Sequence, residues 1–137
     1  MTYYSSETCG YVNNTWVSDG CKNDYAQSEI KYVVDAWKTA QAPAATEARL
    51  ITYDELIDNL GYDPTISSAG NPQRNDNVPT WVYNRNYWYW TSSQHSSSPS
   101  SVWRVYNIGE LNDGDVDRNI DGVVRPVITI SKSALSA

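Results

Sequence analysis

The sequence of 137 residues lacks phenylalanine and contains one methionine and one histidine. It has only 10 lysines and arginines against 16 aspartates and glutamates, so its net charge is −6. Because no basic stripe is available to replace phosphate counterions, we expect no binding to nucleic acid. No apolar run is long enough to span a bilayer and no signal-peptide pattern is found, so we expect no direct membrane insertion by this chain.

Cysteine is scarce as well, since only Cys9 and Cys21 are present, on either side of GYVNNTWVSDG. Three interpretations are open: a short-loop disulfide, two free thiols, or half of a zinc site. The zinc site is the least favoured, because there is one histidine and no second cysteine pair. The disulfide is favoured because the Asn, Asp and Gly residues between the cysteines let the chain turn back. It would contribute the lower end of ~2–4 kcal/mol and would imply an oxidising, extracytoplasmic setting.

What the chain does contain is aromatic residues of the amphipathic kind, with six tryptophans and eleven tyrosines. Its hydrophobic content of 40% and charged content of 19% are those of a globular protein, and its length is that of one domain. Tyr and Trp suit both binding surfaces and wet, shallow cores. We expect the tryptophans mostly in the core and the tyrosines divided between core and surface.

The stretch SEIKYVVDAWKTAQ, residues 28–41, predicts an amphipathic helix. Ser28 is placed to cap its amino end, and Pro43 ends it by disfavouring helical angles in the preceding residue. The stripe expected to face the core consists of Ile30, Val33, Val34 and Trp37.

The stretch ARLITYDELIDNLGY, residues 48–62, predicts a short strand at 49–51 and then a second helix. Thr52 and Glu55 have the spacing of a capping box, and Gly61 is placed to end the helix in a left-handed conformation. Its expected buried stripe is Leu56, Ile57 and Leu60.

Residues 63–79 are rich in Pro, Ser, Gly, Asn and Asp without periodicity, which predicts a long surface loop. The last third is typical of β structure, with strand-forming stretches at 80–93, 101–108 and 122–131. Gly109 and Glu110 are placed to turn the chain, and Pro126 suggests an edge strand or a bulge. Alternation is expected to send Trp103 and Val105 inward. Helices followed by an antiparallel sheet predict an α+β domain.

Three motifs contain residue types that can carry chemistry. The acidic stretch DGDVDRNIDG, residues 113–122, fails the calcium-loop pattern because Ile120 and Pro126 occupy the glycine and glutamate places, so we expect a solvated acidic hairpin. His95 lies among serines with no nucleophile-elbow pattern around it, so we expect it to be an exposed loop residue. Of the carboxylate pairs, Asp54/Glu55 is explained by helix capping, and Asp113/Asp115 has no partner that would shift a pKa. We therefore expect no enzyme, no metal site and no cofactor.

Four stretches occur in a characteristic order: ARLITYDELIDNLGY, WVYNRNYWYWTSS, SVWRVYNIG and GVVRPVITISKSAL. This order resembles the bacterial C-type-lectin-like domains, in the branch shared by formylglycine-generating-enzyme-like proteins and the variable proteins of diversity-generating retroelements. The resemblance covers the chain from about Ser28, which implies an N-terminal extension at 1–27 and a domain at 28–137. It implies a C-type-lectin-like fold, with two helices packed on a twisted antiparallel sheet and long loops.

The resemblance also implies a scaffold and a variable ligand-binding surface. The scaffold positions match Trp88, Trp90, Trp103, Arg125 and Pro126. The surface positions, which alternate with them and are expected to converge into one patch, are Asn84, Asn86, Tyr87, Tyr89, Gln94, His95, Ser97, Ser98, Arg104, Tyr106, Asn112, Asp113, Asp115 and Asp117. The best candidates for most of the affinity are Tyr87, Tyr89, Arg104 and Tyr106.

The function implied is non-enzymatic ligand binding, in adhesion or in recognition of a protein or glycan receptor on another cell surface. The chain is then expected to be exported and displayed on a cell surface, pilus tip or virion, with any anchoring segment outside this chain. A narrower hypothesis is a retroelement variable protein. The calcium-lectin signatures are absent and no cysteine follows Cys21, so neither calcium-dependent sugar binding nor formylglycine generation is expected. Two alternatives stay open: a small hydrolase or sulfatase-type enzyme using the acidic hairpin and His95, and a structural pilin-like subunit.

Overall fold

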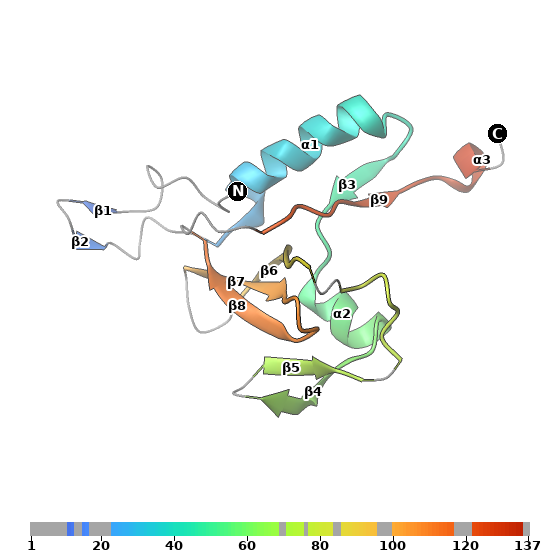
Figure 1. Ribbon diagram of the computed structural model, residues 1–137. Coiled ribbons are helices and arrows are strands. Elements are labelled where there is room, and N and C mark those ends of the chain that lie inside the picture. Colours follow the sequence, from blue (N-terminus) through green and yellow to red (C-terminus); the bar gives the residue numbers. More distant parts are fainter. Residues whose placement is uncertain are drawn as a thin grey trace.

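The computed structural model describes residues 11–12, 15–16, 23–68, 71–75, 77–83, 86–95, 100–116 and 122–135. These ranges form an α+β structure with three α-helices and several antiparallel sheets, where the sequence predicted two helices (Figure 1). The elements are β1 (Tyr11–Val12), β2 (Thr15–Trp16), the 3-10 helix η2 (Tyr25–Gln27), α1 (Glu29–Gln41), β3 (Glu47–Arg49), α2 (Tyr53–Asn59), β4 (Tyr62–Ser68), β5 (Asn71–Arg74), β6 (Tyr89–Gln94), β7 (Ser101–Val105), β8 (Leu111–Asp115), β9 (Val127–Thr129) and α3 (Lys132–Leu135).

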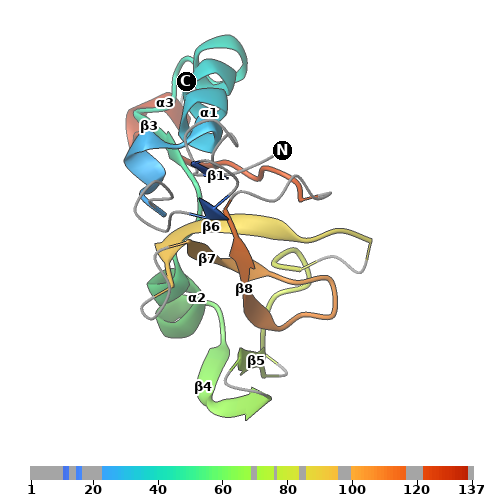
Figure 2. The same cartoon turned by 90° about the vertical axis from the view of Figure 1, so that its left-hand side faces the viewer.

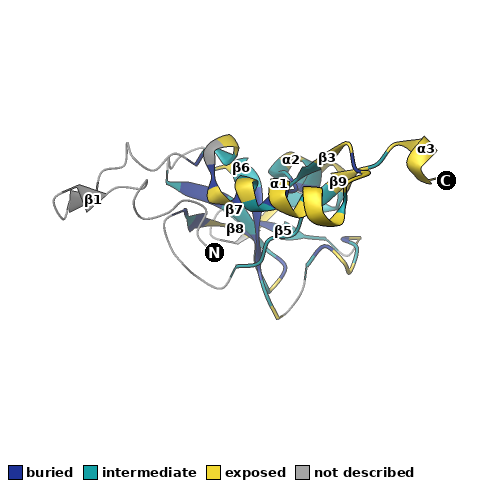
Figure 3. Ribbon diagram, turned by 90° about the horizontal axis from the view of Figure 1, so that it is seen from above, coloured by how far each residue is buried: buried dark blue, intermediate teal, exposed yellow. Residues whose placement is uncertain are grey.

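The first predicted helix is confirmed as α1. The Ser28 side chain accepts a hydrogen bond from the Lys31 amide at 3.0 Å, which caps the amino end as expected. Its buried stripe is narrower than predicted, because only Ile30 and Val34 are fully buried, whereas Trp37 is 37% exposed. In Figure 3 the exposed residues of α1 are yellow on its solvent side.

The second predicted helix is confirmed as α2, with both hydrogen bonds of the capping box between Thr52 and Glu55. Gly61 follows with φ of 89°, the left-handed conformation that the sequence predicted there. The strand before the helix begins earlier than predicted, at Glu47, and pairs antiparallel with β9.

The prediction of a long loop at 63–79 is wrong. Residues 62–74 contain the hairpin of β4 and β5, whose register shifts between Asp63 and Ser67. Among the side chains described in this segment, Tyr62 and Pro72 are buried and the others are exposed or partly exposed. The hairpin is therefore formed by backbone pairing with almost no apolar alternation, and alternation was the signal on which the loop prediction depended.

The central sheet has the strand order β6-β7-β8 and is antiparallel throughout. One of its faces packs against α1, in a cluster of buried residues consisting of Ile30, Val34, Leu50, Trp88, Trp90, Val102 and Val116. The other face packs against α2 and β4, in a cluster consisting of Ile51, Leu56, Tyr62, Val78, Val82, Tyr89, Val105 and Leu111. Figures 1 and 2 show α1 and α2 lying on different sides of these strands.

Buried clusters on both faces contradict the prediction that the strands have one core face and one outward face over their whole length. Tyr89, predicted to point outward, is 3% exposed and its hydroxyl donates a hydrogen bond to the Val82 carbonyl. Val102, on the same face of β7 as Arg104, is fully buried. Trp103, expected in the core, is only partly buried at the edge of the second cluster. The physical reason is that alternation separates the two faces of a strand but does not show which face is covered.

The segment after residue 121 is held against the sheet by Arg125. Its Nη1 and Nη2 atoms donate to the carbonyls of Val82, at 3.2 Å, and Trp81, at 2.7 Å. Its guanidinium carbon also lies 4.6 Å from the centroid of the Tyr89 ring, which is a cation–π contact. Arg125 thus joins three parts of the chain through one side chain.

Candidate functional site

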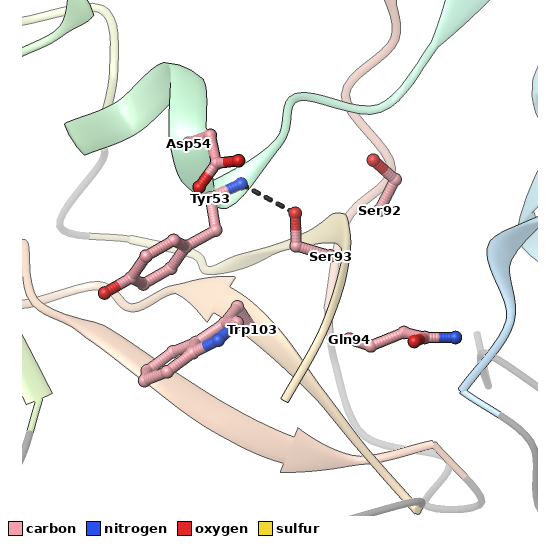
Figure 4. A pocket seen from close by; sticks show the side chains of 6 residues that line it. All are labelled: Tyr53, Asp54, Ser92, Ser93, Gln94 and Trp103. Atoms are coloured by element: carbon pink, nitrogen blue, oxygen red, sulfur yellow. Dashed lines mark hydrogen bonds between the residues drawn. The ribbon is translucent and has the colours of Figure 1, made fainter. Parts of the chain in front are cut away.

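A surface pocket of about 550 Å³ lies where the amino end of α2 meets β6 and β7. Six residues line it: Tyr53, Asp54, Ser92, Ser93, Gln94 and Trp103. Figure 4 shows the rings of Tyr53 and Trp103 on one side and Gln94 on the other. We call this feature the Trp103 pocket.

The walls of the Trp103 pocket are held by hydrogen bonds between distant parts of the chain. The Ser92 amide donates to the Ile51 carbonyl at 3.0 Å, which joins β6 to the segment before α2. The Ser93 hydroxyl accepts from the Tyr53 amide at 2.8 Å, shown as the dashed line in Figure 4. This bond satisfies one of the amides that a helix leaves unpaired at its amino end. The strand and the helix are therefore fixed relative to each other at the pocket.

Behind the pocket, an ion pair fixes the first turn of α2. Arg49 donates to both carboxylate oxygens of Glu55, at 2.6 Å and 3.0 Å, in a bidentate arrangement. The hydrogen bond from Arg49 lowers the pKa of Glu55, and the backbone and side chain of Thr52 lower it further. Glu55 is thus a structural carboxylate, as the capping motif predicted.

Three rings lie side by side at the pocket, with Trp103 in the middle. Its ring centroid is 4.8 Å from that of Tyr53 and 4.7 Å from that of His95, at interplanar angles of 35° and 39°. Burial, together with the neighbouring Asp54 charge, raises the pKa of the Tyr53 phenol. Tyr53 is therefore a neutral hydrogen-bond donor at ordinary pH, and Trp103 presents a partly exposed aromatic surface.

Three carboxylates lie on the same side of the sheet as these rings. Asp54 lines the pocket and is exposed, and Asp113 of β8 lies directly opposite Trp103 in the register of the sheet. Asp115 is on the same face of β8, opposite Ser101, whose hydroxyl lies 3.4 Å from its carboxylate. Among the described residues, no Lys or Arg forms an ion pair with Asp54 or Asp113.

The structure divides the predicted surface residues between two faces of the sheet. Those near the Trp103 pocket are Gln94, His95, Asp113 and Asp115. Those on the α1 side are Arg104, Tyr106 and Asn112. The prediction that all of them converge into one patch is therefore wrong, since neighbouring positions on β8 point to opposite faces.

On the α1 side, Arg104 is engaged in packing. Its Nε donates to Asn112 Oδ1 at 2.6 Å. Its guanidinium lies 4.6 Å from the Trp88 ring and 5.0 Å from the Tyr106 ring. Arg104, Tyr106 and Asn112 are therefore partly buried and in contact with one another or with Trp88.

Of the remaining predicted positions, Asn86 is exposed and Tyr87 is partly buried against the second core cluster. The others lie outside the described residues: Asn84, Ser97, Ser98, Asp117 and the cysteines Cys9 and Cys21. The predicted disulfide therefore stays a prediction.

Sequence reasoning missed Tyr53, Asp54, Ser92 and Ser93 as site residues. Tyr53 and Asp54 were assigned to the first turn of a helix, which is correct but does not show what that turn faces. A signal was present in the clustering of hydroxyl residues after the aromatic run at 87–90. Only the pairing of Ser93 with α2 places that run beside the helix.

Within the described ranges, no three His, Cys, Asp or Glu side chains are grouped so as to hold a metal ion. No helix in these ranges has the length and apolar character needed to cross a membrane.

Comparison of the chain with models of known protein families, with curated proteins and with solved structures finds no match. An assignment of function therefore depends on the residues of the chain and on the geometry of the Trp103 pocket.

Proposed function

We propose that this chain is a non-enzymatic ligand-binding domain that recognises a protein or glycan receptor on another cell surface. The observation that carries the proposal is the Trp103 pocket, where aromatic rings, hydroxyls, an amide and a carboxylate converge. Partly exposed Tyr and Trp rings supply contact area at a low cost in conformational entropy. Ser and Gln side chains beside them supply hydrogen bonds that orient a ligand.

Binding is favoured over hydrolysis by the contacts of the pocket serines. A serine nucleophile needs a base that takes its proton. Among the described residues, neither Ser92 nor Ser93 hydrogen-bonds through its hydroxyl to His95; these hydroxyls contact the Ile51 carbonyl and the Tyr53 amide. His95 instead stacks on Trp103. These contacts support a recognition site over a serine-based hydrolase.

For the scaffold we propose the C-type-lectin-like fold. Three of the positions that the resemblance assigned to the scaffold have structural contacts that support it. The rings of Trp88 and Trp90 meet edge to face at 4.9 Å in the core under α1, and Arg125 joins the final segment to Val82 and to Tyr89 of β6. We further propose that the domain is exported and displayed on a cell surface or a virion, which places its pocket where a receptor can reach it.

A binding array tests the proposal. The labelled chain is applied to arrays of glycans and of extracellular receptor domains, beside the variants Tyr53→Ala and Gln94→Ala. A ligand of the pocket is expected to lose at least about tenfold in affinity with Tyr53→Ala, a loss typical of a central aromatic contact. The matched control is Tyr32→Ala, because Tyr32 is 78% exposed on α1, on the opposite side of the sheet.

The proposal fails if neither array yields a ligand, or if every ligand found binds the Tyr53→Ala and Tyr32→Ala variants equally well. Turnover of an array component by the wild-type chain would replace it with the enzyme alternative. Circular dichroism of each variant shows whether a loss of binding comes from the pocket or from unfolding.

A further inference from the structure

We propose that the Trp103 pocket accepts a cationic side chain, a guanidinium or ammonium group, from a protein ligand. This inference rests on the proposed function and narrows it to one ligand chemistry. Three independent features of the pocket carry it: its charge, its rings and its hydrogen-bond acceptors.

The charge of the pocket is negative. Asp54 lines it and Asp113 lies opposite Trp103 on the neighbouring strand, where the two side chains share one face of the sheet. Within the described residues, these two carboxylates have no Lys or Arg partner. The whole chain has a net charge of −6, so a cationic ligand is attracted at long range as well.

The rings of the pocket form a surface of the kind that cations prefer. Elsewhere, the fold covers its own aromatic faces with arginines: Arg74 lies 4.5 Å from the Tyr83 ring, Arg104 lies 4.6 Å from Trp88, and Arg125 lies 4.6 Å from Tyr89. Among the described residues, no arginine lies over the rings of Tyr53 and Trp103, and the ring that contacts Trp103 besides Tyr53 is that of His95, at 4.7 Å. A ligand guanidinium would repeat there the arrangement that this fold uses internally.

The polar groups of the pocket fit a donor better than an acceptor. A guanidinium offers five N–H donors and no acceptor. The acceptors that line the pocket are the Asp54 carboxylate, the hydroxyl oxygens of Ser92 and Ser93 and the amide oxygen of Gln94. A neutral sugar could stack on the same rings, but it would gain nothing from two negative charges. The carboxylates therefore favour a basic peptide side chain over a glycan.

The test uses the full chain labelled with ¹⁵N and three small probes: N-acetyl-L-arginine amide, its neutral isostere N-acetyl-L-citrulline amide, and methyl glycosides. The indole N–H resonance of Trp103, assigned by triple-resonance experiments, reports on the pocket during each titration. We expect the arginine probe to shift this resonance and to bind at least about fivefold more tightly than the citrulline probe, from the cation–π and ionic contributions.

Variants that remove one negative charge show whether the arginine probe binds at the Trp103 pocket. Asp54→Asn and Asp113→Asn are each expected to weaken the arginine probe by about two- to fivefold, and together by more. The matched control is Asp35→Asn, which removes the same charge from α1, where Asp35 pairs with Lys31. Because all three carboxylates lie at the surface, the variants are expected to fold, and heteronuclear spectra verify this.

Three outcomes overturn the inference. If citrulline or a methyl glycoside shifts Trp103 as strongly as arginine, the pocket binds ligands without selecting a cation, and the proposed function stands while the inference fails. If the arginine probe leaves Trp103 unshifted, or if Asp35→Asn weakens it as much as Asp54→Asn does, no cation-selective pocket exists. The array experiment then decides the proposed function separately.

Discussion

The ring of Trp103 on β7 lies 4.8 Å from the ring of Tyr53 at the start of α2, with the two planes inclined at 35°. This contact joins a strand to a helix from a different part of the sequence and forms the floor of the pocket. It also shows that Trp103 serves two roles, because the residue packs on the second core cluster and remains partly exposed. Its contribution to stability should therefore differ from that of a core tryptophan.

Trp90→Ala should destabilise the domain much more than Trp103→Ala. Trp90 is fully buried, so its truncation leaves a cavity and should cost about 3–5 kcal/mol of unfolding free energy. Trp103 is partly exposed, and its truncation should cost about 2 kcal/mol, because less apolar area returns to water. Urea unfolding followed by far-UV circular dichroism measures both. Equal losses would show that Trp103 belongs to the core, as the sequence alone had predicted.

Acid should weaken the domain through Glu55. Its pKa in the folded protein lies below the ordinary value of 4.5, chiefly because of the hydrogen bond from Arg49. A lowered carboxylate pKa contributes stability that is complete above about pH 4.5 and is lost as the pH falls through the folded value. Glu55→Gln should therefore reduce stability at pH 7 by about 1–2 kcal/mol and flatten the acid limb of the stability profile.

The matched control for this experiment is Asp58→Asn, which changes an exposed carboxylate of the same helix. It should leave the acid limb unchanged. If Asp58→Asn and Glu55→Gln alter the profile alike, the acid sensitivity comes from the overall charge of the chain.

Alkali should unfold the domain through its buried tyrosines. Burial raises the pKa of Tyr89 to about 12 and that of Tyr62 further, above the ordinary value of 10.0. A raised phenol pKa means that the protonated form is favoured by folding, so stability is complete below pH 10 and is lost as the pH rises above it. The ultraviolet absorbance of tyrosinate, at roughly 300 nm, should show that these two groups ionise only when the domain unfolds.

Tyr89→Phe isolates one of these groups. It should reduce stability at neutral pH by about 1 kcal/mol, because the Val82 carbonyl loses the hydrogen bond from Tyr89 and keeps only the one from Arg125, and it should make the alkaline decline less steep. Tyr32→Phe, at a tyrosine that is 78% exposed, serves as the control and should change neither quantity. An unchanged alkaline decline in the Tyr89 variant would contradict the assignment.

Gly109→Ala should destabilise the turn between β7 and β8. Gly109 has φ of 91°, a conformation that other residues adopt at a cost, and an added Cβ would lie 2.7 Å from the Arg74 side chain. We expect a loss of about 1–3 kcal/mol in urea unfolding. Repeating the substitution in an Arg74→Ala background separates the two causes, since only the steric part should disappear there.

For the cysteines, mass spectrometry of the exported protein without reductant should show Cys9 and Cys21 as an oxidised pair. Their short intervening loop is rich in residues that turn the chain, which favours closure. Full alkylation of both thiols in native secreted material would contradict the disulfide and would weaken the extracellular proposal with it.

The sequence by itself determined the features whose causes lie within a few residues. The Ser28 cap, the capping box of Thr52 and Glu55, and the left-handed Gly61 were all predicted, and each depends on contacts between residues less than one helical turn apart or on the freedom of a single residue. The α+β class followed as well, because helical and strand periodicities occupy separate parts of the chain.

Tertiary structure decided everything that depends on what covers a surface. The hairpin of β4 and β5 pairs through backbone groups, which leave little trace in the order of side chains. In the same way, alternation placed Tyr89 and Trp90 on opposite faces of β6, but only the packing of α1 and α2 buried both of them. The Trp103 pocket exists because Tyr53 contacts Trp103, although 50 positions separate the two residues in the sequence. Such a contact depends on which residues are neighbours in space, and the order of residues does not show this.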